Sequence, residues 1–239
     1  MATDGQGVIL AVPHSVDARQ RAAIDLLSRR VSHRLGCPAA AGQVQRGTLH
    51  LDAPLADLHA KGAREIVVVP LTLTRHEFNY SEPPSRSASG SRRRSMSFRV
   101  TEPLGGAPEI ITTVIESLNH SERLPDPSTR IVLVLPFAER AAAPELEKHL
   151  DLIAAAGWQD GRVHSLPTNG TDCELAGVLE PDPGRSSLLV PLVVAPGPFA
   201  DRVAKCAAEH GVDMANVSFH ASEALTALIY RRVLHARRA

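Results

Sequence analysis

The chain has 239 residues, of which 44% are hydrophobic, so it can bury the core of one large domain or of two small ones. Its 26 basic and 26 acidic side chains cancel, which leaves no overall field to attract nucleic acid or an anionic membrane. The three cysteines form no CxxC pair and indicate neither a disulfide framework nor a thiolate metal site. The N-terminus lacks the order of a signal peptide, and no apolar run approaches the roughly 20 residues of a membrane span. We expect a soluble protein of the reducing cytoplasm, with no nucleic-acid or membrane partner.

Apolar runs of strand length alternate along the chain with stretches that have the apolar spacing of helices. The expected strands are Val8–Val12, Ile66–Leu73, Ile131–Leu135 and Leu188–Val194. The expected helices are Ala18–Leu35, Pro54–Lys61, Pro144–Ala156 and Phe199–His210, with Gly36, Gly62, Gly157 and Gly211 as stops close behind them. Strands that are apolar throughout are typical of parallel sheets covered by helices on both faces. The pattern therefore predicts a doubly wound α/β fold.

The two halves of the sequence resemble each other. "VPLTLTRHEF", which starts at Val69, matches "VPLVVAPGPF", which starts at Val190, and "SFRVTEPL" matches "SFHASEAL" at the same offset of 121 residues. Such a repeat predicts two similar α/β domains in tandem, residues 1–119 and 130–239, joined by a polar linker at 120–129. We expect the two domains to pair with each other.

One segment, Ser81–Ser97, has no apolar period and is rich in Ser, Pro and Arg. We expect a mobile loop, placed after the second strand where open α/β sheets carry ligand-contacting loops. It contains the basic cluster Arg92, Arg93 and Arg94. These arginines either bind carboxylates of a substrate or form a solvated surface.

Two histidines stand out because only the N-terminal half has them. Superposing the repeats pairs His14 with Phe137 and His76 with Gly197. Each histidine follows the carboxyl end of an expected parallel strand, which is the edge where open α/β sheets bind ligands. A neutral imidazole pair suits late first-row divalent metals, whereas a single histidine there is more often a hydrogen-bonded polar cap. We expect a metal site at His14 and His76, with Glu77 as a further candidate ligand, and no metal centre in the second half.

At these residues the sequence resembles the CbiX-type (SirB-like) class II chelatases, which insert cobalt or iron into sirohydrochlorin. "ILAVPHSVDARQRAAIDLLSRRV", "DAPLADLHAKGAREIVVVPLTL" and "FRVTEPLGGAP" carry the resemblance, which covers most of residues 7–118 well and the second half weakly. It implies that His14 and His76 are the metal-binding and catalytic residues. The sequence departs from the family at Pro13 and Ser15, which replace glycines, and at Ala107, which replaces a histidine. An expected acidic residue before the second helix is absent or displaced to Asp52, near His50.

The resemblance implies a metallochelatase that inserts Co²⁺ or Fe²⁺ into a sirohydrochlorin-type tetrapyrrole, with Ni²⁺ as a further candidate metal. Two neutral histidines leave coordination positions open for pyrrole nitrogens, and imidazole can accept a proton near neutral pH. Two alternatives remain open at the level of sequence. One is a metal-dependent enzyme of specialised metabolism that acts on a smaller heterocycle, and the other is a non-enzymatic metal-binding protein.

Overall fold

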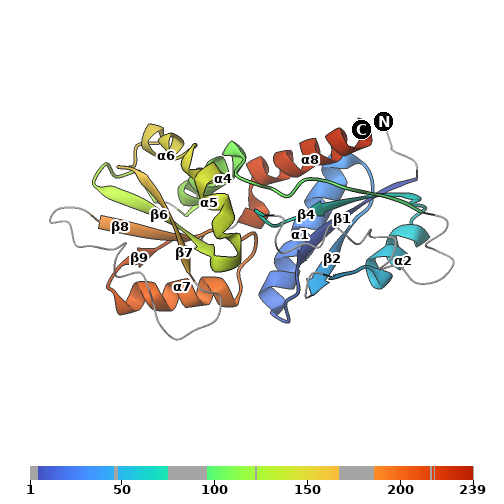
Figure 1. Cartoon of the computed structure of the whole chain (residues 1–239), viewed down its shortest axis with the longest axis horizontal. Coiled ribbons are helices and arrows are strands. Elements are labelled where there is room, and N and C mark those ends of the chain that lie inside the picture. The colour runs from blue at the N-terminus through green and yellow to red at the C-terminus, as the bar shows by residue number, and fades with distance from the viewer. Residues whose placement is uncertain are drawn as a thin grey trace. The chain divides into compact units, whose positions relative to one another are not determined.

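The structure is a computed structural model that describes residues 5–45, 48–74, 96–121, 123–166, 186–215, 217 and 219–238. The chain divides into two compact units, which are labelled by element in Figure 1. Unit 1 is Met1–Gly105 with Thr226–Ala239, and unit 2 is Gly106–Leu225. The repeat in the sequence predicted a boundary at 120–129 instead, so the two divisions differ in where α4 (Pro108–His120) and most of α8 (Glu223–Arg238) belong.

The described strands of unit 1 form a five-stranded sheet in the order β3-β2-β1-β4-β5. The strands are β1 (Gln6–Pro13), β2 (Ala39–Gln45), β3 (Thr48–His50), β4 (Glu65–Pro70) and β5 (Ser97–Val100). Four of them run parallel, and β3 pairs antiparallel with β2. The central strand β1 is buried from Gly7 to Val12, as the apolar run at its start predicts.

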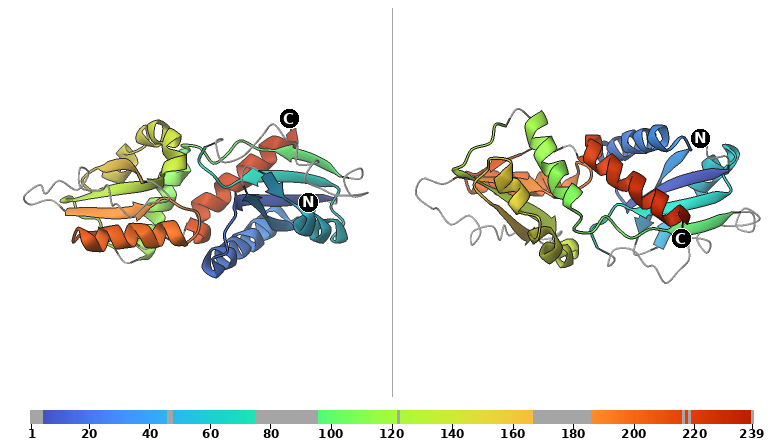
Figure 2. Two further views of the ribbon diagram at one scale, coloured as in Figure 1. Left: turned by 60° about the horizontal axis from the view of Figure 1, so that its bottom comes forward. Right: turned by 90° about the horizontal axis from the view of Figure 1, so that it is seen from above.

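Helices cover both faces of this sheet. α2 (Asp52–Ala60) contributes Leu55 and Leu58 to a core with Ile9 and Ala11 of β1. α1 (Ala18–Leu35) and α8 lie side by side, with the Arg34 guanidinium over the ring of Tyr230, and the right-hand view of Figure 2 shows the two helices adjacent. Because β-strand side chains alternate between the two faces, one strand supplies apolar groups to both layers.

Unit 2 repeats the arrangement with a parallel sheet in the order β7-β6-β8-β9 among its described strands. The strands are β6 (Thr129–Pro136), β7 (Gly161–Leu166), β8 (Ser186–Pro191) and β9 (Asp213–Met214). α7 (Pro198–Glu209) packs Val203, Cys206 and Ala207 on one face. The remaining helices are α4, the 3₁₀ segments η2 (Phe137–Ala142) and η3 (Phe219–Ala221), and the short α5 (Ala143–Glu147) and α6 (Asp151–Ala155).

The order β2-β1-β4-β5 in unit 1 therefore equals the order β7-β6-β8-β9 in unit 2. The expectation of two similar parallel-sheet α/β folds is confirmed. The helix after the last strand of each half, however, belongs to the other unit. In unit 1, α8 is held by hydrogen bonds from Arg232 to the Leu104 carbonyl and from Arg99 to the Ala236 carbonyl. In unit 2, α4 receives a hydrogen bond from the Ser222 hydroxyl to Glu116 at 2.7 Å.

Most expected helices occur within two residues of their predicted ends, and the four glycines expected as stops all have positive φ. The expected single helix Pro144–Ala156 is instead split into α5 and α6. Between them the backbone bonds run from residue i to i−3, as from His149 to Leu146 and from Ile153 to Leu150. This tighter winding accompanies close packing on β7, where a Cβ at Gly161 would lie 2.7 Å from the Ile153 side chain.

Among the described residues, no helix is long and apolar enough to cross a membrane. Cys37 is free and buried, whereas Cys206 is disulfide-bonded, which the spacing of the cysteines did not indicate.

The packing of α8 predicts which strands depend on it. Ile229 is fully buried and belongs to unit 1, so Ile229→Ala should lower the free energy of unfolding by about 2–5 kcal/mol. Amide hydrogen exchange should rise more in β1 and β4 than in β6 and β8. Leu124→Ala, which truncates a side chain that is 84% exposed, serves as the control. A larger loss of protection in β6 and β8 would contradict the division of the chain described above.

The start of α1 predicts a pH dependence. Asp17 caps the helix by accepting the Arg19 amide, and the Arg19 side chain lowers the pKa of Asp17 from 3.8 to about 2. Because the folded pKa is the lower one, the carboxylate stabilises the fold above pH 3.8 and loses this effect as the pH falls toward 2. Asp17→Asn should therefore be less stable than the unsubstituted protein at neutral pH, and the difference should shrink across that window. Denaturant unfolding at a series of pH values measures this, with Asp25→Asn on the same helix as the control.

Candidate functional site

His14 is the first residue after β1 and its side chain is exposed. Its backbone amide donates to the Val44 carbonyl at 2.8 Å, which continues the pairing of β1 with β2 by one residue. Its ring Nδ1 lies 2.7 Å from Oε1 of Gln43 on β2. Backbone and side chain of His14 are thus both held by the end of β2, and the imidazole is presented at the carboxyl edge of the sheet.

The neighbouring strand β4 ends at the same edge, because β1 and β4 are parallel and Ala11 pairs with Pro70. The chain is described as far as Thr74, two residues before His76. The Thr74 hydroxyl is buried and has no hydrogen-bond partner among the residues that the structure describes, so it is a polar group that a bound water or ligand can satisfy.

The other predicted site residues, His76, Glu77, Arg92, Arg93 and Arg94, lie outside the described residues, as does most of the segment Ser81–Ser97. Within the part of the chain that is described, no group of three or more His, Cys, Asp and Glu side chains could hold a metal ion. The shared site of His14 and His76 therefore stays a prediction.

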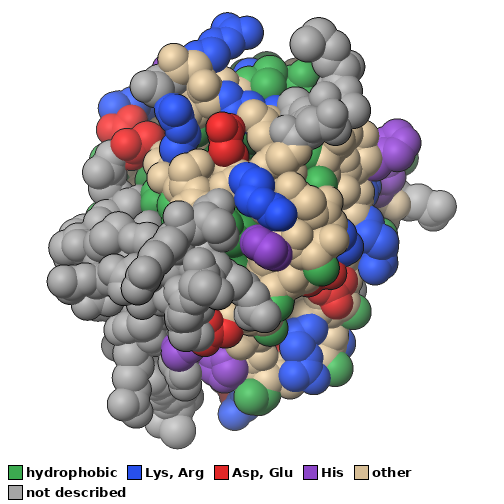
Figure 3. All heavy atoms as spheres, turned by 90° about the vertical axis from the view of Figure 1, so that its right-hand side faces the viewer, with side chains coloured by type: hydrophobic (Ala, Val, Ile, Leu, Met, Phe, Trp, Pro, Cys, Tyr) green, Lys and Arg blue, Asp and Glu red, His purple; other side chains and the backbone are tan. Residues whose placement is uncertain are grey.

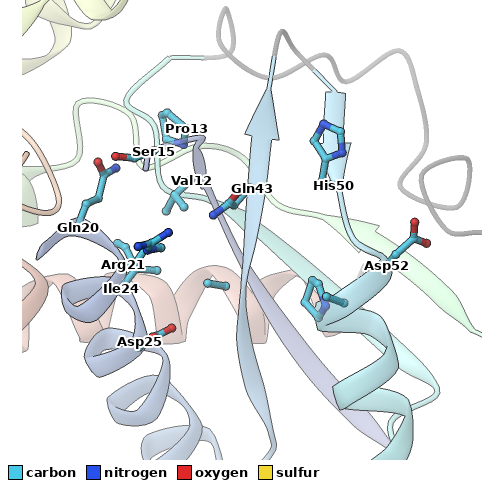
Figure 4. A pocket seen from close by; sticks show the side chains of 13 residues that line it. Val12, Pro13, Ser15, Gln20, Arg21, Ile24, Asp25, Gln43, His50 and Asp52 are labelled. Atoms are coloured by element: carbon cyan, nitrogen blue, oxygen red, sulfur yellow. The ribbon is translucent and has the colours of Figure 1, made fainter. Parts of the chain in front are cut away.

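A pocket of about 470 Å³ lies beside the end of β1, between α1, β2 and the start of α2. Figure 4 shows Arg21 reaching from α1 and Gln43 from β2 toward this space, with His50 on β3 at its other side. Val12, Pro13, Ile24, Ala41, Ala53 and Pro54 form its apolar walls. Its polar lining is Ser15, Gln20, Arg21, Asp25, Gln43, His50 and Asp52.

The charges around this pocket are mixed. Arg21 makes no ion pair with any residue that the structure describes, although it lies in the first turns of α1, where the helix dipole disfavours a cation. Asp25 and Asp52 add two carboxylates to the same lining. On the face of the molecule drawn in Figure 3, where the pocket is not marked, acidic, basic and histidine side chains are also intermingled. The pocket thus offers both an anion contact and cation contacts.

Sequence reasoning missed Gln43 as a site residue and treated His50 only as a neighbour of Asp52. It missed Gln43 because "AAAGQVQ" has no apolar run and so did not predict β2. The sequence did show a polar residue, Gln43, near the end of a short segment rich in small residues. Such a pattern alone is too weak to predict a strand.

The second unit carries different residues at the equivalent places. Phe137 directly follows β6, as His14 follows β1, and Gly197 precedes α7. The structural repeat thus supports the pairing of His14 with Phe137, whereas the pairing of His76 with Gly197 stays a prediction because His76 lies outside the described residues. The absence of a metal centre in the second half remains a prediction.

No protein-family model matches the sequence, and no curated protein matches it. Three solved structures are similar over nearly the whole chain. SirB from Bacillus subtilis with Fe³⁺ has a TM-score of 0.68 and 20% identity, covering 97% of this chain and 95% of that one. The sirohydrochlorin chelatase SirB from Bacillus subtilis subspecies spizizenii in complex with cobalt has a TM-score of 0.65 and 15% identity, covering 98% and 95%.

The third structure is CbiX, the terminal enzyme for the biosynthesis of siroheme in denitrifying bacteria. It has a TM-score of 0.58 and 16% identity, covering 97% of this chain and 99% of that one. The similarity thus extends over nearly the full length of this chain and of each of the three structures, while sequence identity stays at or below 20%. The chain has the two-sheet α/β fold of the SirB and CbiX chelatases.

Proposed function

We propose that this protein is a metallochelatase that inserts Co²⁺ or Fe²⁺ into a sirohydrochlorin-type tetrapyrrole. The observation that carries the proposal is the exposed imidazole of His14, held at the carboxyl edge of the unit 1 sheet in the fold of SirB and CbiX. The metal ion is a substrate of this reaction. The same fold in SirB with Fe³⁺ and in SirB in complex with cobalt supports a first-row transition metal.

His14 and His76 are proposed to hold the ion. The parallel pairing of β1 with β4 supports this, since the two histidines follow neighbouring strands at one edge. Two imidazoles suit Co²⁺, Fe²⁺ and Ni²⁺ and leave positions open for the pyrrole nitrogens. Insertion also releases two protons from the macrocycle, and each of the two imidazoles can accept one of them once it has released the ion, with Glu77, next to His76 in the sequence, as a further acceptor.

The surroundings of His14 suit a flat, partly apolar ligand. Pro13 and Val16 on either side of this residue are exposed, and Val16 is 80% accessible to solvent. Their apolar surface can contact the face of a macrocycle, while basic residues contact its carboxylates. We propose Arg92, Arg93 and Arg94 for that second role.

A second candidate function is a metal-dependent reaction on a smaller heterocycle. The pocket of about 470 Å³ beside His14 supports it, because that volume lies within the range of ordinary small-molecule sites. Pro13 and Ser15, which replace the glycines of the chelatase motif, line this pocket. Both functions use the metal at His14, so they differ in substrate rather than in site.

The chelatase reaction predicts a direct spectroscopic result. Purified protein mixed with Co²⁺ and sirohydrochlorin should metallate the macrocycle faster than the same mixture without protein, as its visible spectrum reports. His14→Ala and His76→Ala should each lower this rate at least 10-fold, because each removes one ligand of the ion. His33→Ala removes an exposed histidine from α1 and should leave the rate unchanged. Stoichiometric Co²⁺ binding without any metallation would contradict the chelatase function and favour the second candidate.

The arginine cluster predicts a separation of substrate binding from metal binding. Replacing Arg92, Arg93 and Arg94 with Ala should raise the KM for sirohydrochlorin and leave Co²⁺ affinity unchanged, because guanidinium groups bind carboxylates and not cations. Replacing all three with Lys keeps the charge and should cost less. Added salt should raise the KM of the unsubstituted protein more than that of the Ala variant. An unchanged KM in the Ala variant would remove this cluster from the substrate site.

A further inference from the structure

We infer that Gln43 is a positioning residue, which fixes the tautomer of His14 so that the Nε2 atom of its ring faces the metal ion. The inference rests on the proposed role of His14 as a metal ligand. It concerns a contact between two described residues, and it names the ring atom that binds the ion.

The hydrogen bond between His14 and Gln43 determines which ring nitrogen carries the hydrogen. Nδ1 of His14 lies 2.7 Å from Oε1 of Gln43, and an amide oxygen is only an acceptor. The hydrogen must therefore be on Nδ1. In a neutral imidazole the other nitrogen, Nε2, then carries the lone pair. A metal ion binds that lone pair, so this hydrogen bond selects the ligating atom.

Gln43 is well placed to hold the ring still. It lies on β2, where it pairs with Val12 of β1 and with His50 of β3, so hydrogen-bonded strands flank it on both sides. Its side chain is half-buried at the pocket wall. The His14 amide is bonded to the carbonyl of the next residue, Val44. Two successive residues of one strand thus fix the backbone and the ring of His14.

The amide also sets the charge at this position. A carboxylate that accepts from a ligating histidine makes the imidazole more electron-rich and binds the metal more tightly. A neutral amide orients the ring without adding a negative charge. This arrangement suits an ion that must be released to a substrate, and it predicts that Gln43→Glu raises Co²⁺ affinity.

The test measures the tautomer and the metal affinity separately. In the metal-free protein above the titration range of histidine, ¹⁵N and ¹³C NMR of the imidazoles should show His14 with its hydrogen on Nδ1. Gln43→Ala should shift His14 toward the Nε2–H form and weaken Co²⁺ binding about 10–100-fold, as loss of a residue that orients a ligand typically does. Gln20→Ala removes the same side chain from another wall of the pocket and should change neither quantity.

Gln43→Met, which keeps the length of the side chain without an acceptor, repeats the test if the Ala variant unfolds. A His14 ring that carries its hydrogen on Nε2 in the unsubstituted protein would overturn the inference, as would Co²⁺ affinity that is unchanged in both Gln43 variants. Neither measurement requires tetrapyrrole. A changed tautomer and affinity in a protein that metallates nothing would leave the role of Gln43 standing and reject the chelatase function alone.

Discussion

The pairing of β1 with β2 on one side and β4 on the other is the constraint on which the rest of the structure depends. It buries β1 on both faces from Gly7 to Val12, so no polar side chain can be accommodated until the strand leaves the sheet. His14 is the first ionisable side chain beyond that point, and the next helix begins at Ala18. The pairing that builds the core therefore also places the His14 imidazole at the carboxyl edge of the sheet, where the parallel strands β2 and β4 end as well.

The residues of β2 beside His14 are mostly small or polar, unlike the large apolar residues of the core. β2 contributes small residues along most of its length and then Gln43, which reaches the His14 ring. Asp17, the cap of α1, is itself paired with Arg19. Arg21, one helical turn after Asp17, lines the pocket. Charged residues at the start of α1 thus either cap the helix, as Asp17 does, or line the pocket, as Arg21 does.

The core of this fold was predictable from the sequence, and much of its site was not. Continuous apolar runs predicted β1, β4, β6 and β8, because strands buried on both faces need apolar residues throughout. β2 escaped prediction because its small residues carry no such signal, and Gln43 was lost with it. The exchange of α4 and α8 was equally hidden, since periodicity identifies a helix face but not the sheet that the face covers. The position of His14 just after a strand was predictable because the apolar run of β1 stops before it, while its role as a metal ligand stays a prediction.

The exchange of α4 and α8 bears on the origin of the chain. Each half supplies one sheet and a last helix that completes the opposite unit. A single half on its own would lack a covering helix, and two identical halves would satisfy each other by reciprocal swapping, as a closed homodimer does. In the present chain both halves are joined by one backbone, so each last helix reaches the opposite unit without a second molecule.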